Sequence, residues 1–243
     1  MWRDVQIAVI VPAYNEARLI GATLRSVPAY VDRIVVVDDG SADDTAAEVA
    51  RAGDARVSLV RHAHNQGVGQ ALCTGYAHAF AEGAEIVAVM AGDGQMHPDD
   101  LPALLAPVVS GAADYAKGNR FAWPGAWRAM PPVRVAGSVV LSLLTRLASG
   151  YWHVFDSQCG YTVVSRQTLA AIGPERLFAR YGYPNDLLAR LATVGARVVD
   201  VPVRPVYGPE WRSGLRPARV ALPIAGLLLR GWVRRLRAEA RAS

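Results

Sequence analysis

The amino-acid sequence predicts an α/β fold in which a mostly parallel β-sheet is flanked by helices. Along the first half of the chain, short runs of β-branched residues alternate with segments of helical periodicity. Such alternation is typical of a parallel sheet covered by helices on both faces. Polar or acidic residues directly follow three of these runs, at the strand ends where sheets of this kind bind ligands.

The elements of the first half can be assigned in order. Strands are expected at residues 6–11, 33–37, 57–61 and 85–90. Helices are expected between them, at residues 17–26, 43–52 and 69–81. Ser41 or Asp43 is available to cap the second helix.

The second half has a different pattern. Lys117-Gly118-Asn119-Arg120 ends a further strand, and a proline-interrupted aromatic stretch then leads into an apolar helical segment at residues 133–149. Further strands are expected at residues 163–165 and 197–203, with a helix at 186–194 between them. Because no internal repeat or low-complexity linker divides the chain, we expect one domain over residues 1–217, followed by a helix at 218–243.

Composition and length exclude several classes of protein. The 243 residues are 52% hydrophobic and 19% charged, which excludes wholesale disorder. No apolar run reaches the ~18 residues that a membrane-spanning helix needs, and the polar N-terminus does not resemble a secretory signal. Cys73 and Cys159 have no metal-type or disulfide spacing, so reduced thiols in a cytoplasmic protein are expected.

The net charge of +5 is concentrated near the C-terminus, where arginines crowd the last fourteen positions after the apolar run at residues 220–229. A solvated helix face is one interpretation. The other is an amphipathic anchor at residues 218–243 that lies on the cytoplasmic face of a membrane, with arginines meeting lipid phosphates. Nucleic acid is not expected as a partner, because the chain has no zinc, helix-turn-helix or aromatic RNA-binding motif.

The segment Gly92-Asp93-Gly94-Gln95 follows a buried strand and presents a carboxylate and an amide. An ordinary Asp-Gly turn is one interpretation. However, acidic residues also follow the first two strands, at Glu16 and at Asp38-Asp39. Together these strand ends predict a nucleotide-binding edge, at which oxygen ligands could hold Mg²⁺ or Mn²⁺ beside a diphosphate.

At this point the sequence resembles the family-2 glycosyltransferases of the GT-A (Rossmann-like) fold, especially those similar to dolichyl- or polyprenyl-phosphate sugar synthases. The resemblance covers roughly residues 6–216. It rests on Val11-Pro12-Ala13-Tyr14-Asn15-Glu16, Val37-Asp38-Asp39-Gly40-Ser41, Asn65-Gln66-Gly67-Val68-Gly69, Gly92-Asp93-Gly94-Gln95 with Pro98, Gly118-Asn119-Arg120, and Tyr207-Gly208 with Glu210 and Ser213.

The resemblance implies a set of donor-binding residues for a UDP- or GDP-linked sugar. They are Pro12, Tyr14, Glu16, Val37, Asp39 and Gly92. Asp93 and Gln95 would ligate Mg²⁺ or Mn²⁺, although Ala91 stands where the family has the first carboxylate of an Asp-x-Asp triplet. Near the C-terminus, Arg212 and Arg216 would flank a loop that closes over the diphosphate.

The resemblance also implies a lipid phosphate acceptor, bound by Arg120, Arg134 and Ser138. Surface salt bridges are the alternative for the two arginines. Because a polyprenyl phosphate is already an anion, it would attack the anomeric carbon without a general base, and the sugar would be transferred with inversion. The expected activity is that of an inverting hexosyltransferase.

Other functions remain open. If the acceptor is a sugar or natural-product hydroxyl, a base is needed, and Asp186 is the leading candidate, or else only the N-cap of its helix. Asp156 is second, in a loop expected to line the sugar pocket with Gly160. A catalytically weak, membrane-associated scaffold is an alternative of another class. A nucleotidyltransferase is disfavoured because no glycine- and arginine-rich loop follows the first strand, and a dehydrogenase because the glycine spacing is wrong.

Overall fold

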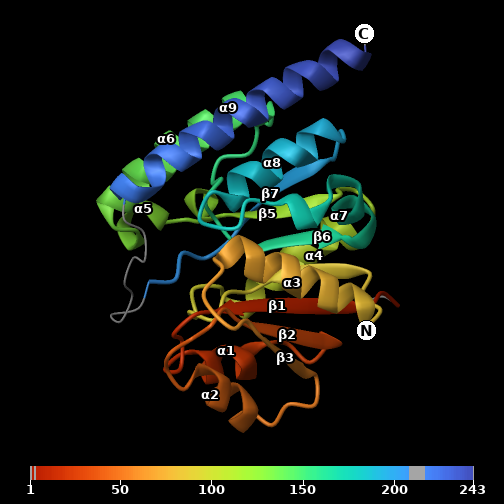
Figure 1. The fold of residues 1–243 in the computed structure, drawn as a ribbon, viewed down its shortest axis with the longest axis vertical. Coiled ribbons are helices and arrows are strands. Elements are labelled where there is room, and N and C mark those ends of the chain that lie inside the picture. Colours follow the sequence, from red (N-terminus) through yellow and green to blue (C-terminus); the bar gives the residue numbers. More distant parts are fainter. Residues whose placement is uncertain (1, 3, 208–216, 243) are drawn as a thin grey trace.

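The computed structural model describes residue 2, residues 4–207 and residues 217–242, and it has the predicted α/β architecture (Figure 1). Its sheet is seven-stranded, in the order β3-β2-β1-β4-β6-β5-β7. Only β6 runs antiparallel to its neighbours, β4 and β5. The strands are β1 (Ile7–Ala13), β2 (Arg33–Asp38), β3 (Val57–Arg61), β4 (Ile86–Val89), β5 (Tyr115–Asn119), β6 (Thr162–Ser165) and β7 (Val198–Pro202).

Helices cover both faces of this sheet, and short 3₁₀ turns connect some of them to the strands. The α-helices are α1 (Ile20–Ser26), α2 (Thr45–Arg51), α3 (Val68–Ala81), α4 (Leu101–Val109), α5 (Ala126–Ala129), α6 (Pro132–Ser149), α7 (Arg166–Ile172), α8 (Tyr183–Thr193) and α9 (Pro217–Ala242). The 3₁₀ turns are η1 (Pro98–Asp100), η2 (Arg120–Ala122) and η3 (Pro174–Arg176).

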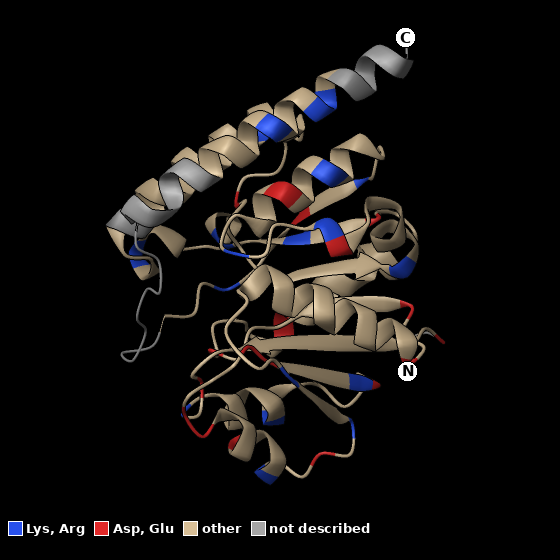
Figure 2. Cartoon of the chain, in the orientation of Figure 1, with Lys and Arg blue, Asp and Glu red and all other residues tan. Residues whose placement is uncertain are grey.

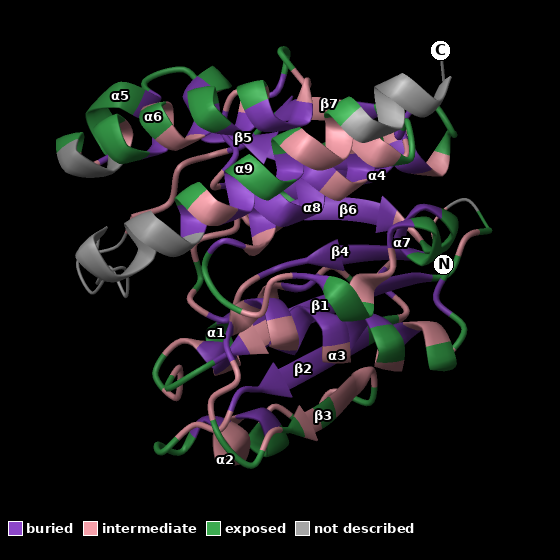
Figure 3. Ribbon diagram, turned by 45° about the horizontal axis from the view of Figure 1, so that its top comes forward, coloured by how far each residue is buried: buried purple, intermediate pink, exposed green. Residues whose placement is uncertain are grey.

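The two faces of the central strands bury separate hydrophobic clusters. Ile7 and Val9 of β1 belong to the cluster that contains residues of α1, α2 and α4. Ala8 and Ile10 belong to the opposite cluster, with residues of α3, α7 and α8. A strand buried on both faces must be apolar at every position, which is why the sequence identifies β1 so clearly. Figure 3 shows the resulting buried centre, in purple.

Helices α6 and α9 form an outer layer that packs against α8 (Figure 1). Ala148 of α6 and Ile224 and Leu228 of α9 are buried together. The approach of α9 to α8 is close, because a Cβ on Gly231 would lie 2.8 Å from Cβ of Ala189. The central part of α9 is therefore held by packing against α6 and α8.

The structure differs from the sequence expectations mainly at element ends and in the short helices. α1 begins at Ile20 rather than at residue 17, and α8 begins at Tyr183 rather than at 186. α4 was not predicted from the sequence, because it carries Pro107 in its interior, where proline normally interrupts a helix. Ser41 was wrong as a helix cap, since its Oγ accepts a hydrogen bond from the backbone N–H of Asn15 instead.

Two further expectations concern the whole chain. Among the residues that the structure describes, no helix is long and apolar enough to cross a membrane. Cys73 and Cys159 are both buried and are not joined by a disulfide.

Candidate active site

The polar segments that follow β1, β2 and β4 meet at one edge of the sheet because these strands are parallel neighbours. The first two segments are joined directly. The backbone N–H of Asn15 donates to Ser41 Oγ over 2.9 Å, and the N–H of Ala42 donates to Asn15 Oδ1 over 2.9 Å. Asn15 has a φ of +57°, a left-handed conformation that asparagine adopts more readily than most residues. The local sequence therefore shapes this edge.

Asp39 fixes the loop that leads into α3. Its Oδ1 accepts from the N–H of Gln66 over 2.9 Å and lies 2.7 Å from Nδ1 of His62, while its Oδ2 accepts from the N–H of Gly67 over 2.8 Å. Gly67 has a φ of +100°, and a Cβ there would lie 2.5 Å from the carbonyl oxygen of Ala179. Only glycine fits this position.

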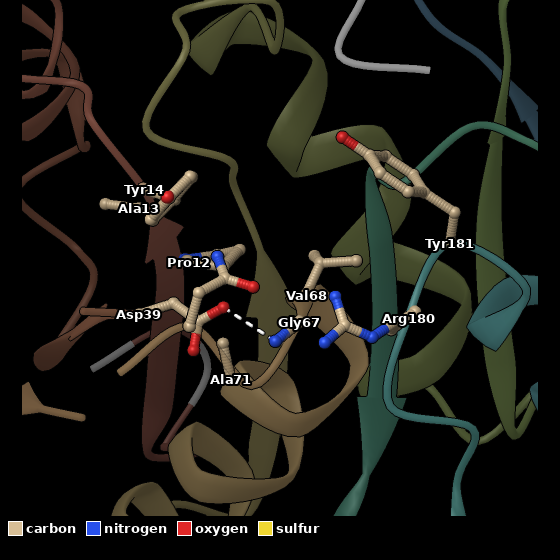
Figure 4. A pocket seen from close by; sticks show the side chains of 10 residues that line it. Pro12, Ala13, Tyr14, Asp39, Gly67, Val68, Ala71, Arg180 and Tyr181 are labelled. Atoms are coloured by element: carbon tan, nitrogen blue, oxygen red, sulfur yellow. Dashed lines mark hydrogen bonds between the residues drawn. The ribbon is translucent and has the colours of Figure 1, made fainter. Parts of the chain in front are cut away.

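Asp39 also lines a small cavity of about 140 Å³ at the same edge. In Figure 4, Asp39 and Tyr14 lie on one side of this cavity and Arg180 and Tyr181 on the other. Pro12 lines it as well, so three of the expected nucleoside-binding residues come together here. The side-chain oxygens of Asp39 are already hydrogen bonded, so its main effect is to shape the wall.

A larger cavity of about 780 Å³ lies beside the first and shares Pro12, Val68 and Tyr181 with it. Its wall includes four other residues that the sequence analysis assigned to the donor, metal and acceptor. These residues are Asp93, Gln95, Arg120 and Ser138. The remaining wall is mostly apolar and includes residues of α6, Ile224 of α9 and the segment Gln158–Tyr161.

Asp93 and Gln95 form a small oxygen-rich unit on the wall of this larger cavity. Nε2 of Gln95 donates to Asp93 Oδ2 over 2.8 Å, and the backbone N–H of Gln95 donates to Oδ1 over 3.1 Å. This orientation leaves Oε1 of Gln95 as an acceptor beside the carboxylate. Burial, together with the charges of Asp93 and Asp43, raises the pKa of Glu16 to about 7. The site thus concentrates negative charge.

These donors fit a hard divalent cation only in part. Among the described residues, no three His, Cys, Asp or Glu side chains cluster closely enough to hold a metal by themselves. Asp93 and Gln95 supply oxygen ligands of the type that Mg²⁺ and Mn²⁺ prefer. A metal held here would need further oxygens, such as those of a bound diphosphate, since the methyl side chain of Ala91 on the cavity wall offers no oxygen ligand.

Arg120 and Asp156 form a buried ion pair next to the cavity. Nε of Arg120 donates to Asp156 Oδ2 over 2.7 Å, and NH2 donates to Oδ1 over 2.9 Å. NH1 donates to the hydroxyl of Tyr207 over 3.0 Å. Burial alone would raise the pKa of Asp156, but the charge and hydrogen bonds of Arg120 hold it below its ordinary value. Both groups are therefore charged at neutral pH.

This geometry corrects two expectations. The surface salt bridge is wrong for Arg120, because this residue is 7% exposed, pairs with the buried Asp156 and lines the cavity. Asp156 does not face the cavity, since both of its carboxylate oxygens bind Arg120. The loop that follows it does line the cavity, through Gln158, Cys159, Gly160 and Tyr161.

Asp186 lies away from both cavities, on the side of α8 that packs against α9. Its Oδ2 accepts from Nε of Arg190 over 2.9 Å and from the N–H of Phe178 over 3.1 Å, and its Oδ1 accepts from Arg234 over 3.1 Å. The N-cap alternative was wrong, because Gly182 precedes the first turn of α8 and Asp186 lies inside the helix.

The remaining site residues fall into three groups. Val37 is fully buried in the hydrophobic cluster beneath α3, so its side chain does not reach either cavity. Gly92 packs against the end of β1, where its N–H donates to the carbonyl of Pro12, and a Cβ would lie 3.0 Å from Ile20. Arg212, Arg216 and the side chain of Arg134 lie outside the described residues.

Several residues that line the cavities were not predicted from the sequence. Arg180 and Tyr181 come from a loop that crosses the start of α3, where the N–H of Gln70 donates to the carbonyl of Ala179. No sequence motif marks this loop. Arg204 lines the larger cavity and follows β7. The rule that ligands bind beyond the carboxyl ends of parallel strands could have identified it.

Comparison with known proteins supports the fold and the family. The model of a family described as Glycosyl transferase family 2 matches residues 8–173. The chain is 29% identical over 219 residues to the UDP-N-acetylglucosamine–dolichyl-phosphate N-acetylglucosaminyltransferase of Methanococcus voltae. This alignment covers 84% of this chain and 87% of that protein. It is 32% identical over 203 residues to the polyprenol monophosphomannose synthase of Mycolicibacterium smegmatis, and this alignment covers 80% of this chain and 75% of that protein.

Among solved structures, the chain resembles glucosyl-3-phosphoglycerate synthase of Mycobacterium tuberculosis, solved in complex with Mn²⁺, UDP and glucosyl-3-phosphoglycerate. The TM-score is 0.69 at 22% identity, and the match covers 94% of this chain and 80% of that one. At this identity the similarity concerns the fold alone. The prediction of a GT-A fold is confirmed.

Proposed function

The chain belongs to glycosyl transferase family 2, and on that basis we propose that it transfers a sugar from a nucleoside-diphosphate donor to a polyprenyl phosphate. One observation carries the proposal. A single cavity of about 780 Å³ is lined by the oxygen donors Asp93 and Gln95, by the guanidinium of Arg120 and by the apolar side of α6. Diphosphate, acceptor phosphate and hydrocarbon chain would each meet a matching surface there.

The donor would occupy the edge formed by the ends of β1, β2 and β4. The nucleoside would lie in the smaller cavity beside Pro12, Tyr14 and Asp39, and the diphosphate would extend toward Asp93 and Gln95. These two residues would hold Mg²⁺ or Mn²⁺ together with diphosphate oxygens. The metal, when bound, stabilises the negative charge of the departing nucleoside diphosphate. We propose that Arg212 and Arg216 supply further positive charge to the diphosphate.

The acceptor phosphate would bind at Arg120. The pair with Asp156 locks the guanidinium in one orientation, and the N–H groups not donated to Asp156 or Tyr207 can bind phosphate oxygens. Arg134 and Ser138 are the further candidates, and Ser138 is buried on the cavity wall. Because the phosphate is an anion, positioning replaces proton abstraction, and in-line attack on the anomeric carbon inverts its configuration.

The outer faces of α6 and α9 support association with a membrane surface. Leu143, Leu144 and Leu147 of α6 are exposed at the spacing of one helical face, next to Val140 at the edge of the larger cavity. Leu229, Trp232 and Leu236 of α9 are exposed in the same way, and Figure 3 shows exposed stretches of α9 in green. Side chains of this kind favour the boundary between lipid headgroups and hydrocarbon.

The charge on these two helices matches an anionic bilayer. The sequence of α6 contains no acidic residue, and the described side chains of α9 include arginines but no acidic group (Figure 2). We therefore propose a catalytic domain at residues 1–217 with a surface anchor at 218–243, peripheral on the cytoplasmic face. Part of the apolar run at 220–229 attaches the helix to the rest of the protein instead, since Ile224, Leu227 and Leu228 are buried.

The other proposed functions receive less support from the geometry. Transfer to a hydroxyl acceptor needs a base within hydrogen-bonding reach of the substrate, and Asp186 lies off the cavity wall in contact with two arginines. A catalytically weak scaffold would not need a buried arginine on the wall of a cavity that also holds Asp93.

A radiolabelled donor panel tests the proposal. The full chain is incubated with UDP- and GDP-linked sugars, Mg²⁺ or Mn²⁺, and membranes that contain polyprenyl phosphate, and the products are extracted into organic solvent. Transfer predicts label in the organic phase for at least one donor, and its loss in the Asp93→Ala variant. Label confined to the aqueous phase for every donor would contradict a lipid acceptor.

A further inference from the structure

Asp200 of β7 is a buried carboxylate that no step of the proposed reaction uses. Burial raises the pKa of this carboxyl above its ordinary value. Its Oδ2 accepts from the backbone N–H of Phe155 over 2.7 Å and from Nδ2 of Asn119 over 2.8 Å. Within the described part of the chain, Oδ1 is buried without a hydrogen-bond partner.

The two groups that bind Asp200 each precede one member of the buried ion pair. Asn119 precedes Arg120, and Phe155 precedes Asp156. Asn119 is also held at its other end, because its Oδ1 accepts from the N–H of Ala122 and so caps the turn η2 that carries Arg120. One carboxylate oxygen therefore fixes the distance between the two segments that present the pair.

The strand register places a compensating charge opposite this carboxylate. Lys117 of β5 pairs with Asp200 of β7, and its Nζ, which is fully buried, donates to the carbonyl of Cys159. Burial lowers the pKa of Lys117, while the charges of Asp156 and Asp200 oppose that effect. Two acidic and two basic groups thus lie together beneath the cavity wall. Burying charged groups is costly, and a purely structural contact between strands does not require it.

We propose that Asp200 is a positioning residue that aligns Arg120 for the acceptor phosphate. The inference rests on the proposed function, because it assigns Arg120 to the acceptor. Asp200 acts through Asn119 and Phe155, and it does not touch the cavity itself. Small displacements of a binding group are sufficient to weaken a phosphate contact, since hydrogen bonds depend steeply on distance and angle.

The test compares two substitutions at this position with a matched control. Asp200→Ala removes the acceptor of both hydrogen bonds, whereas Asp200→Asn keeps a carbonyl oxygen that can accept them. Asp114→Ala is the control, because Asp114 also joins the β5 and β7 region, accepting from the N–H of Arg197 over 2.7 Å, but lies on the surface away from the cavities. Initial rates are measured while donor and acceptor are varied separately.

We expect Asp200→Ala to raise the KM for polyprenyl phosphate by about tenfold, as for other residues that orient a binding group. The KM for the donor should stay unchanged, Asp200→Asn should recover most of the acceptor affinity, and Asp114→Ala should leave both constants unchanged. A purely structural role would lower the thermal midpoint and the active fraction of the enzyme, but it would not raise the KM for polyprenyl phosphate more than the KM for the donor. Equal changes in both KM values would therefore overturn the inference.

A second measurement does not depend on turnover. The Nε–H resonance of Arg120, assigned by its disappearance in Arg120→Lys, is followed by NMR in the full chain. Asp200→Ala should shift it and speed its exchange with solvent, while Asp114→Ala should not. An unchanged resonance would overturn the inference. Absence of transfer to polyprenyl phosphate by the unmodified chain would instead contradict the proposed function, and the resonance would still decide the role of Asp200.

Discussion

Arg234 of α9 donates a hydrogen bond to the buried carboxylate of Asp186 in α8, over 3.1 Å. The same carboxylate accepts from Arg190 one turn further along α8. The C-terminal helix is thus joined to the catalytic fold by an ion pair as well as by the packing of Leu227 and Leu228. This contact bears on two questions, because Asp186 was the candidate base and α9 the candidate anchor.

Asp186→Asn should reduce stability and leave catalysis largely intact. The amide cannot accept as strongly from two guanidinium groups, so the free energy of unfolding should fall by about 1–3 kcal/mol. Urea denaturation and kcat of the same preparation measure the two effects. Arg234→Met is the matched control and should lower stability without changing kcat. A loss of kcat by about 10²-fold or more in Asp186→Asn alone would identify a general base.

Arg120→Met should be strongly destabilising, because it leaves the carboxylate of Asp156 buried without its partner. We expect a loss of about 3–5 kcal/mol in chemical denaturation. The double variant Arg120→Met with Asp156→Asn should recover part of this loss, since the uncompensated charge is then removed. Strictly additive effects would show that the two side chains are not coupled in solution.

Metal-dependent binding of UDP or GDP should require Asp93. In Asp93→Asn, calorimetric titration should no longer detect the gain in nucleotide affinity that Mn²⁺ provides to the unmodified chain. Ala91→Asp should have the opposite effect, because it places a second carboxylate on the cavity wall. Equal Mn²⁺ dependence in the unmodified chain and in Asp93→Asn would show that the metal is held elsewhere.

Glu16 should make stability depend on pH. Its pKa is about 7 in the folded chain and 4.5 for the unperturbed group, so the folded state binds the proton more tightly. Raising the pH from 4.5 to 7 therefore lowers the free energy of unfolding, and the loss persists above pH 7. Glu16→Gln should remove this component when urea unfolding is measured across the range. Parallel pH profiles for the two proteins would contradict a raised pKa.

Exposed leucines of α6 should contribute to vesicle binding. We expect Leu143→Ser with Leu147→Ser to weaken cosedimentation with anionic vesicles by about tenfold, through lost apolar burial. Leu59→Ser is the control, because Leu59 is also exposed but lies on β3. Binding should fall with added salt and in neutral vesicles. Equal vesicle binding by the double variant and the Leu59→Ser control would contradict this prediction. A changed oligomeric state of the double variant would then show that the surface joins two copies of the chain.

Much of the fold could be predicted because its strands carry a strong local signal. β1, β2 and β4 are apolar at nearly every position, and the motifs that follow them mark the edge where the site lies. Of the six residues expected to bind the donor, Pro12, Tyr14 and Asp39 line one cavity, and their role in donor binding stays a prediction. α4 was missed, since Pro107 obscures its helical pattern and only packing against the sheet stabilises it.

The sequence by itself determined the parallel α/β architecture, the family, and the strand ends at which polar residues gather. These properties depend on periodicity and on short motifs, which are local along the chain. The partners of Arg120, Asp186 and Asp200 were decided only by the tertiary structure. Each pairing joins residues from separate segments, and whether a charged group meets solvent, substrate or a buried counter-ion depends on the packing of whole elements.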